Sequence, residues 1–395
     1  MGKIIDVTCK VTETERNRSR PMRVNGTSWL IILLAFVVSF IEDSVAGNPS
    51  LTQAKKEADA KGYIFYTTHD QIVNAAKKEG KLRVSSGLET ANFKPLLAAF
   101  KQKYPFVTDT QFGEVQGTDA YQRFILEMKA GAAKEWDVPH IPIDFALDYP
   151  AHLAKHDILG MAQQGVLKID TRMIHPVERN MVAVTSNLTV VPFNKKLISD
   201  DKVPTKWEDF LKPEFKGKQI LADLRPLSLA GLIPAWGLEK TLVFAGNLAA
   251  QQPVWGSGAT RLNNRIASGE YPVYVASNFS SVKRAISKDP TGALSYKIVE
   301  PIPTRVVDQC SGILKTSNNP HMALLWIEFL ASREGQEIID KYEPLRASLF
   351  TSGSATEQVT RGKQLSVVGW DHFAKYQEYN AKIFAAWGFP NARGQ

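Results

Sequence analysis

Small polar residues and glycines recur where predicted strands give way to predicted helices. The backbone N–H groups in the first turn of a helix lack partners within the helix, and the helix dipole makes them attractive to anions. The same residue types also cap helices, so each one alone fits a structural role as well as ligand contact. Together they predict one ligand-binding cleft, formed by Ser85, Ser86, Gly117, Thr118, Ser228, Ser277 and Asn278.

Two arginines and one aspartate extend this predicted cleft. Arg225 directly follows the end of a predicted strand, Asp223 lies two residues before it, and Arg261 lies in a second loop. A guanidinium group binds a carboxylate or phosphonate through two parallel hydrogen bonds. For Arg261, a surface pair with Glu270 is an equally good interpretation. The set favours a small anionic organic ligand.

Patterns for metal binding or covalent chemistry are weak. His152 and His156 have the i, i+4 spacing of two metal ligands on one helix face, but no third ligand is linked to them, which favours a solvated helix face. Cys310 lies in an apolar run without a partnered histidine, which predicts a buried thiol and not a nucleophile. The sequence has no complete phosphate loop, dinucleotide fingerprint, HExxH or GxSxG motif. We therefore expect a protein that is not an enzyme, with no catalytic residue, no metal and no cofactor.

The elements that would position these residues alternate between strand and helix. Residues 92–103 place apolar side chains at i, i+3, i+4 and i+7, which is typical of an amphipathic helix. Asn319 and Pro320 open the apolar segment 320–331 as an N-cap and first helical residue would. The other main predictions are strands at 82–85, 219–222, 271–276, 297–301 and 306–314, and a helix at 229–238. This alternation predicts α/β lobes with mixed, mostly parallel sheets.

Composition limits the classes of function. The 395 residues are 44% hydrophobic and 22% charged, so the chain can bury sizeable cores, and two lobes are expected. The net charge of +8 comes from single Lys and Arg residues alternating with acids, without a basic stripe that could follow a phosphate backbone. We therefore expect no nucleic-acid partner.

The apolar run from Trp29 to Ile41 reads as an export signal. It is too short to cross a bilayer comfortably, and the small residues 44–47 after it suit signal peptidase. We predict a signal peptide over residues 1–46, with cleavage after Ala46, or after Gly47 as second choice, and a periplasmic protein; an N-terminal anchor helix is the alternative. Cleavage removes Cys9 and leaves Cys310 alone, so the mature chain has no internal disulfide.

Five phrases in order along the chain carry a family resemblance. They are KLRVSSGLETANFKPLLAAFKQKYP (81–105), VVPFNKKLI (190–198), VPTKWEDFLKPEFKGK (203–218), RLNNRIASGEYPV (261–273) and NPHMALLWIEFLASREGQEIIDKYEPLRAS (319–348). The combination resembles the type 2 periplasmic solute-binding proteins, in the family 1 extracellular group that includes ferric-iron and aminoethylphosphonate binders. Each phrase alone is weakly specific.

The resemblance implies a two-lobed α/β fold with mixed sheets and a two-strand hinge. Lobe one would comprise residues 80–186 and 302–395, lobe two residues 192–296, and the crossings would lie near 188–191 and 298–301. The implied function is the substrate-binding component of an ABC importer, a monomer that closes over a small-molecule solute and presents it to a membrane permease.

The ferric-binding branch of this family uses neighbouring tyrosines, because phenolate oxygens are hard anionic donors. The matching region here reads NFSSVKRA (278–285), and no two tyrosines are adjacent in the chain. We therefore expect an anionic organic solute. The alternatives are a ferric-ion binder with scattered tyrosines and a carboxylate or carried anion, and, from another class, a secreted α/β hydrolase or transferase.

Overall fold

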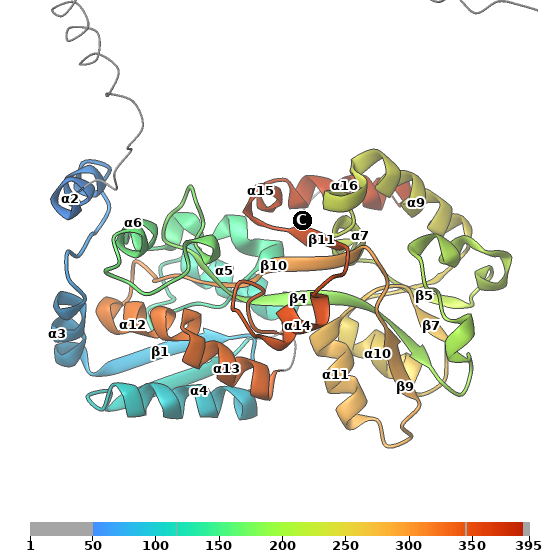
Figure 1. Cartoon of the computed structure of the whole chain (residues 1–395), viewed down its shortest axis with the longest axis horizontal. Coiled ribbons are helices and arrows are strands. Elements are labelled where there is room, and N and C mark those ends of the chain that lie inside the picture. The colour runs from blue at the N-terminus through green and yellow to red at the C-terminus, as the bar shows by residue number, and fades with distance from the viewer. Residues whose placement is uncertain (1–49, 116, 344–345, 390–395) are drawn as a thin grey trace, which may run out of the picture. The chain divides into compact units, whose positions relative to one another are not determined.

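The computed structural model describes residues 50–389, except 116 and 344–345 (Figure 1). The predicted signal peptide at 1–46 lies outside the described residues. From Pro49 onward the chain forms one compact unit. Within its described part, no helix is both long enough and apolar enough to cross a membrane.

Two long strands form the centre of the larger sheet. β4 (Val182–Asn194) and β10 (Ile302–Ser311) pair in antiparallel fashion and run side by side through the middle of the ribbon (Figure 1). The strand order is β11-β10-β4-β7-β5-β6, with β3 on β10 and with β8 and β9 on β4. The shorter strands are β3 (Ile141–Pro142), β5 (Ile220–Asp223), β6 (Val254–Gly256), β7 (Val273–Tyr274), β8 (Ser277–Asn278), β9 (Leu294–Lys297) and β11 (Leu365–Val368).

The expectation of mostly parallel sheets is wrong for the centre of this sheet. Its parallel pairs are β5–β6, β5–β7 and β10–β11, whereas β4 pairs in antiparallel fashion with β7, β8, β9 and β10. The path of the chain explains this. The chain leaves one half of the unit along β4 and returns along β10, and neighbouring strands that run in opposite directions form an antiparallel ladder.

One half of the unit is organised around a buried helix. A small parallel sheet of β1 (Lys81–Ser86) and β2 (Asp109–Glu114) lies beside α12 (Pro320–Ala331), whose residues from Met322 onward are all buried. Trp326 of α12 packs against Phe100 at a ring-centroid distance of 5.0 Å. The predicted helix at 320–331 is confirmed residue for residue. The other helices here are α3 (His69–Glu79), α4 (Thr90–Lys103) and α13 (Arg333–Tyr342).

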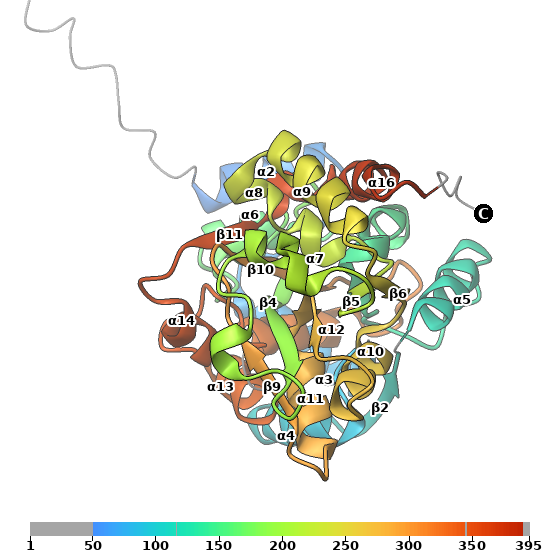
Figure 2. The ribbon, with the colours of Figure 1, turned by 90° about the vertical axis from the view of Figure 1, so that its right-hand side faces the viewer.

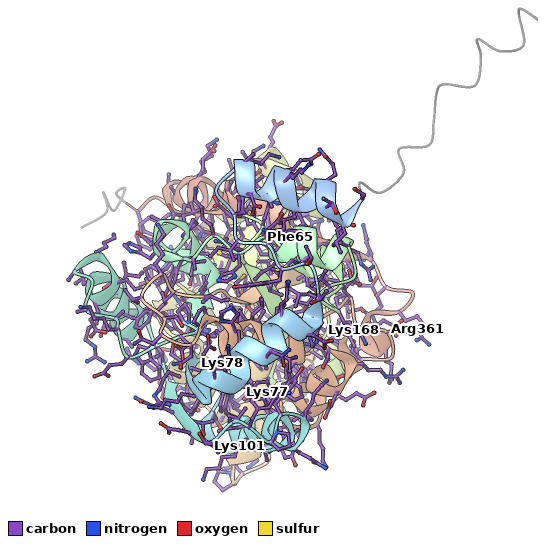
Figure 3. All side chains as sticks on the ribbon, turned by 90° about the vertical axis from the view of Figure 1, so that its left-hand side faces the viewer. Phe65, Lys77, Lys78, Lys101, Lys168 and Arg361 are labelled. Carbon is purple, nitrogen blue, oxygen red and sulfur yellow. The ribbon has the colours of Figure 1, made fainter. Side chains whose placement is uncertain are left out.

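Helix α12 is capped by a carboxylate from a distant helix. The side chain of its N-cap, Asn319, makes no capping hydrogen bond. Instead, Glu79 at the end of α3 accepts from the backbone N–H groups of His321 (3.2 Å) and Met322 (2.7 Å). Figure 3 shows this end of the unit, with Lys77 and Lys78 on α3. The carboxylate complements the helix dipole and ties α3 to α12.

The other half has its own apolar core, formed by Val191, Phe193, Trp207, Phe210 and Phe244 among others. Its longer helices are α9 (Leu238–Ala250), α10 (Ala259–Ala267) and α11 (Phe279–Lys288). The predicted helix at 229–238 is wrong. The chain forms two single turns, α7 (Leu227–Ala230) and α8 (Ile233–Trp236), and Gly237 has φ +80°, which ends the turn before α9 begins.

The C-terminal segment joins this second core. After β11 the chain forms α15 (Trp370–Phe373) and α16 (Tyr376–Ala386), and α16 lies beside α9 (Figures 1 and 2). Tyr376, Ile383 and Trp387 belong to the same core as Phe193. The last helix of segment 302–395, expected in lobe one, therefore shares a core with the segment expected to form lobe two.

Each of the remaining predicted strands has a counterpart in the structure, but its first and last residues differ from the prediction. Those at 82–85, 219–222 and 271–276 appear as β1, β5 and β7, whereas those at 297–301 and 306–314 lie three or four residues earlier, as β9 and β10. The other helices are α2 (Leu51–Ala60), α5 (Thr118–Lys129), α6 (Ile158–Gln163) and α14 (Ala355–Thr360). The 3-10 turns are η1 (Ile143–Asp148), η2 (Pro150–His152), η3 (Thr171–Met173), η4 (Asp200–Lys202), η5 (Trp207–Leu211) and η6 (Pro213–Phe215).

Candidate binding cavity

A cavity of about 690 Å³ lies where the two halves meet at β4 and β10. Its lining comes from both halves and from the central strands. Its polar and charged lining residues are Asp119, Tyr121, His140, Asp144, Asn187, Asp223, Arg225, Ser228, Ser257, Thr260, Arg261, Tyr274, Asn278, Ser280, Ser281, Arg284, Arg305, Asp308 and Arg346. This volume and polarity suit a small hydrophilic molecule.

The structure brings six of the ten sequence-predicted site residues to this cavity, namely Gly117, Asp223, Arg225, Ser228, Arg261 and Asn278. Ser85, Ser86 and Ser277 are buried and are not among its lining residues. Ser85 supports a cavity-lining residue from outside the cavity, because its Oγ accepts a hydrogen bond from the backbone N–H of His140 at 2.8 Å. Thr118 begins helix α5, and its side chain lies outside the described part of the chain.

Three helix N-termini open beside the cavity, as the sequence pattern predicts. Helix α5 begins after Gly117, which has φ +87°, and α10 begins after Gly258, which has φ +89°. Asn278 caps α11 by accepting a hydrogen bond from the Ser281 N–H at 2.9 Å. The first turns of these helices supply partial positive charge to the cavity.

Arg225 is held in place by Asp223. The Asp223 carboxylate accepts from the Arg225 backbone N–H at 2.9 Å and from its guanidinium Nη2 at 3.0 Å. The Tyr274 hydroxyl donates to the same carboxylate at 3.3 Å. Asp223, predicted as a ligand contact, therefore also orients an arginine. Arg261 lies in the first turn of α10 and not in a loop as expected, and it is exposed. It has no ion-pair partner among the described residues, so the alternative pair with Glu270 is not formed; Glu270 pairs with Arg265 instead, at 2.8 Å.

The cavity floor is a buried charged cluster. Asp308 on β10 pairs with Arg305 at 3.1 Å and with Arg346 at 3.7 Å, and Asn187 on β4 donates to it at 3.3 Å. In a regular strand, residues three apart face opposite sides. Here the β10–β4 register shifts between Arg305 and Gln309, and this irregularity accompanies the pairing of Arg305 with Asp308.

Arg346 carries an unused donor on this floor. The residue is only 8% exposed, yet its Nε has no hydrogen-bond partner among the described residues. A buried donor without a partner costs about 1–3 kcal/mol, more when it is charged. Two arginines share the carboxylate of Asp308, and the carboxylates of Glu343 and Asp144 lie near enough to interact with them. An anionic ligand would give the unused Nε of Arg346 a partner.

Burial shifts the protonation of other lining groups. Burial, together with the nearby Arg346 guanidinium, lowers the pKa of His140 to about 3, so its imidazole is neutral at physiological pH. Burial raises the pKa of Asp144, against the opposing effect of Arg305 and Arg225. Burial also raises the pKa of Tyr121. The cavity lining thus combines these groups with five arginines and with the carboxylates of Asp119, Asp223 and Asp308.

Arg284 of α11 connects the cavity wall to helices of the other half. Its Nη2 lies 2.7 Å from Glu343 Oε1 at the end of α13, and its Nε lies 3.5 Å from Glu89 Oε1 at the start of α4. Asn92 donates to Glu343 at 2.8 Å, and Lys288 lies 3.6 Å from Glu89. These contacts form an ion-pair cluster between the cavity-lining Arg284 and the ends of α4 and α13, from here on called the Arg284 latch.

The sequence pass missed several lining residues, above all Arg305, Asp308 and Arg346. The sequence did contain a signal for Arg305 and Asp308, because the two charged residues interrupt an apolar strand. Burying a charge costs free energy unless the charge has a partner. Asn187 gives the same signal within the apolar run of β4. Arg346 stands in the phrase PLRAS that carries the family resemblance, but nothing in its own neighbourhood marks it as a cavity residue.

The other candidate residues do not form reactive sites. His152 lies in η2 and the chain is extended at Leu153, so the expected helix face at 152–156 is wrong. His156 is buried, which lowers its pKa to about 4. Cys310 is a buried free thiol, as predicted, and burial raises its pKa. No group of three or more His, Cys, Asp or Glu residues that could hold a metal occurs within the described residues.

Residues 148–376, more than half of the chain, match the model of the bacterial extracellular solute-binding protein family. The chain therefore belongs to the bacterial extracellular solute-binding proteins. This confirms the resemblance inferred from the sequence, and with it a role in solute binding.

Solved structures support the two-lobed α/β fold. The chain is similar to a ferric iron-binding protein A from Mannheimia haemolytica in an open conformation (17% identity, 78% of this chain and 99% of that one, TM-score 0.60). It is also similar to the substrate-binding protein of an ABC transporter from Agrobacterium tumefaciens (16%, 77% and 95%, 0.58). A third similar structure is the Atu4243–GABA receptor (14%, 80% and 98%, 0.57). At these identities the likeness establishes the fold, and the predicted fold class is confirmed.

Proposed function

We propose that this protein binds a small anionic organic solute in the cavity and delivers it, from the periplasm, to the permease of an ABC importer. The observation that carries the proposal is the buried Arg346 guanidinium, whose Nε lacks a partner beside a floor with two arginines and one carboxylate. The similar ABC-transporter protein from Agrobacterium tumefaciens supports the importer.

The proposed lobes follow the two cores. We assign residues 80–186 and 302–367 to lobe one, and residues 192–296 together with the C-terminal segment from 368 to lobe two, because that segment shares the second core. The proposed hinge crossings remain 188–191, within β4, and 298–301, just before β10. The Arg284 latch then joins lobe two to lobe one, as expected for a closed form whose ligand contacts both lobes.

Iron is less well supported as the cargo. Two tyrosines, Tyr121 and Tyr274, line the cavity, but iron binding needs the phenolate form. Burial raises the pKa of both, and the Tyr274 hydroxyl donates to Asp223. A phenolate beside that carboxylate is disfavoured by like charge. The similar ferric-binding protein from Mannheimia haemolytica keeps iron as the second candidate.

Removing Arg261 or Arg225 tests the sign of the solute. A charge-assisted hydrogen bond contributes about 1.5–3 kcal/mol, so either substitution by Ala should weaken an anion by roughly ten- to a hundredfold. Arg261→Ala is the cleaner variant, because Arg261 has no described ion-pair partner whereas Arg225→Ala leaves Asp223 unpaired. Calorimetric titration at one salt concentration, with carboxylates, phosphonates, amines and ferric citrate, measures the effect.

The control for that titration is Arg361→Ala, because Arg361 lies outside the cavity and 70% of its side chain is exposed (Figure 3). The Arg361→Ala protein should bind each anion with the affinity of the wild-type protein. If neither Arg225→Ala nor Arg261→Ala weakens any anion, the anionic-solute proposal is wrong.

We also propose export with removal of the first 46 or 47 residues. The thirteen-residue apolar run and the small residues after it fit a cleaved signal better than an anchor. N-terminal sequencing of periplasmic protein should therefore read from Gly47 or Asn48. A mature chain that begins before Trp29 would show that the segment is retained.

A further inference from the structure

Helix α16 supports one cavity loop through a single buried phenol. Tyr376, its first residue, is 2% exposed, and its hydroxyl donates to the backbone carbonyl of Leu227 at 2.5 Å. Leu227 lines the cavity together with Ser228 and follows Arg225 by two residues. The Tyr376 hydroxyl thus holds the backbone of the loop that presents Arg225.

The same phenol faces the cavity floor. Burial raises the pKa of the Tyr376 phenol, and the nearby Arg305 guanidinium opposes this rise, while Arg305 Nε pairs with Asp308 on the floor at 3.1 Å. Arg305 is 7% exposed, so its orientation depends on these few neighbours. The phenol therefore lies near an arginine of β10 while its hydroxyl donates to Leu227, the first residue of α7. These two parts of the wall lie 78 residues apart in sequence.

The other end of α16 supports the second loop of the same half. Trp387 packs in a tilted arrangement against Trp255 of β6 at a ring-centroid distance of 4.8 Å, and the Phe389 ring lies 5.2 Å from that of Trp255. β6 ends at Gly256, and the residues from Ser257 to Arg261 line the cavity. The cavity-lining segment from Ser257 to Arg261 therefore directly follows a strand that packs against the end of α16.

We propose that Tyr376 is a positioning residue for solute binding, which fixes the Arg305 guanidinium and the Leu227 loop in their binding geometry. This proposal rests on the proposed anion-binding function of the cavity. A pre-organised guanidinium loses less freedom when an anion binds, so removing the phenolic oxygen should reduce affinity without removing any group that touches the solute.

The first test needs no solute. Tyr376→Phe keeps the ring in the core and removes only the hydroxyl, so backbone amide hydrogen exchange in residues 223–230 should become about tenfold faster. Tyr379→Phe is the matched control, since it lies one turn further along α16, packs at the edge of the same core and lines no part of the cavity. Unchanged exchange in residues 223–230 of Tyr376→Phe would overturn the proposal.

The second test is a double-mutant cycle with inorganic phosphate, methylphosphonate and succinate as probes. Tyr376→Phe should weaken the tightest of the three by about three- to tenfold, and should have no further effect in an Arg305→Gln background. A purely structural tyrosine would lower the melting temperature in both backgrounds and leave the two substitutions additive in affinity, which would contradict the proposal. If the wild type binds none of the three anions, the proposed function fails, while hydrogen exchange still decides the role of Tyr376.

Discussion

Substituting Arg346 by Met will weaken anionic solutes by about a hundredfold, at the upper end of the range for one charge-assisted hydrogen bond, which is the largest single effect expected at this cavity. Arg346 is buried, its Nε is unpartnered, and it shares Asp308 with Arg305. A guanidinium that is already desolvated loses little hydration when an anion arrives, so its contribution exceeds that of the exposed Arg261. Calorimetric titration with carboxylates and phosphonates measures the loss.

Two further variants separate charge from geometry at this position. Arg346→Lys keeps the positive charge but loses the planar fork, so it should bind anions with intermediate affinity. Arg333→Met removes an arginine whose side chain is 81% exposed and far from the cavity lining, and should bind like the wild type. An Arg346→Met protein that stays folded and binds anions as tightly as the wild type would contradict the assignment of Arg346.

Substituting Arg284 by Gln will open the cavity mouth. Glu343 is 4% exposed, and removing its guanidinium partner from a buried pair costs on the order of 3 kcal/mol. The closed form should therefore lose population, and small-angle scattering of the unliganded protein should show a larger radius of gyration. Solute affinity should also fall, because the free energy of closing the lobes then has to come from ligand binding alone.

The same latch predicts a pH effect. Burial alone would raise the pKa of Glu343, but the guanidinium groups of Arg346 and Arg284 outweigh it and hold the pKa below its ordinary value of 4.5. A carboxyl with a lowered folded-state pKa stabilises the protein above its unfolded-state pKa, and that stabilisation is lost as the pH falls through the folded-state value. Wild-type stability should therefore drop below about pH 4.5, and Arg284→Gln should show a smaller drop.

Lys288→Gln provides the matched control for the latch. Lys288 lies on the same helix and approaches Glu89 at 3.6 Å, but 72% of its side chain is exposed, so its contribution should be close to zero. The double variant Arg284→Gln with Glu343→Gln removes the stranded charge and should recover stability without restoring closure. An Arg284→Gln protein with the wild-type radius of gyration would show that the latch does not hold the lobes.

Local patterns predicted much of this fold because they depend on neighbours in sequence. The apolar segment and its Asn319-Pro320 start gave helix α12 its correct bounds. The small residues Gly117, Ser228 and Asn278, predicted from strand ends, lie at the cavity, Ser228 in α7 and Asn278 in β8. The predicted helix at 229–238 failed because Gly237 interrupts a continuous apolar pattern, and apolar periodicity alone does not detect a positive φ angle.

The cavity floor and the Arg284 latch could not be predicted in the same way, because they depend on contacts between distant segments. Arg284 and Glu343 are 59 residues apart, and Asn187 reaches Asp308 across 121 residues. The pairing of Arg305 with Asp308 accompanies an irregularity in the β10–β4 ladder that no local motif encodes. Sequence reasoning thus found Arg225 and Arg261, and missed Arg284 on α11 as well as the arginines on or beside the central strands.

Native mass spectrometry of the protein purified gently from the periplasm tests the central claim most directly. The account predicts one small organic anion bound per chain, released unchanged on denaturation, and lost from Arg346→Met protein prepared in the same way. A bound ferric ion with the visible absorption band of a phenolate complex would contradict it, as would recovery of a chemically converted molecule.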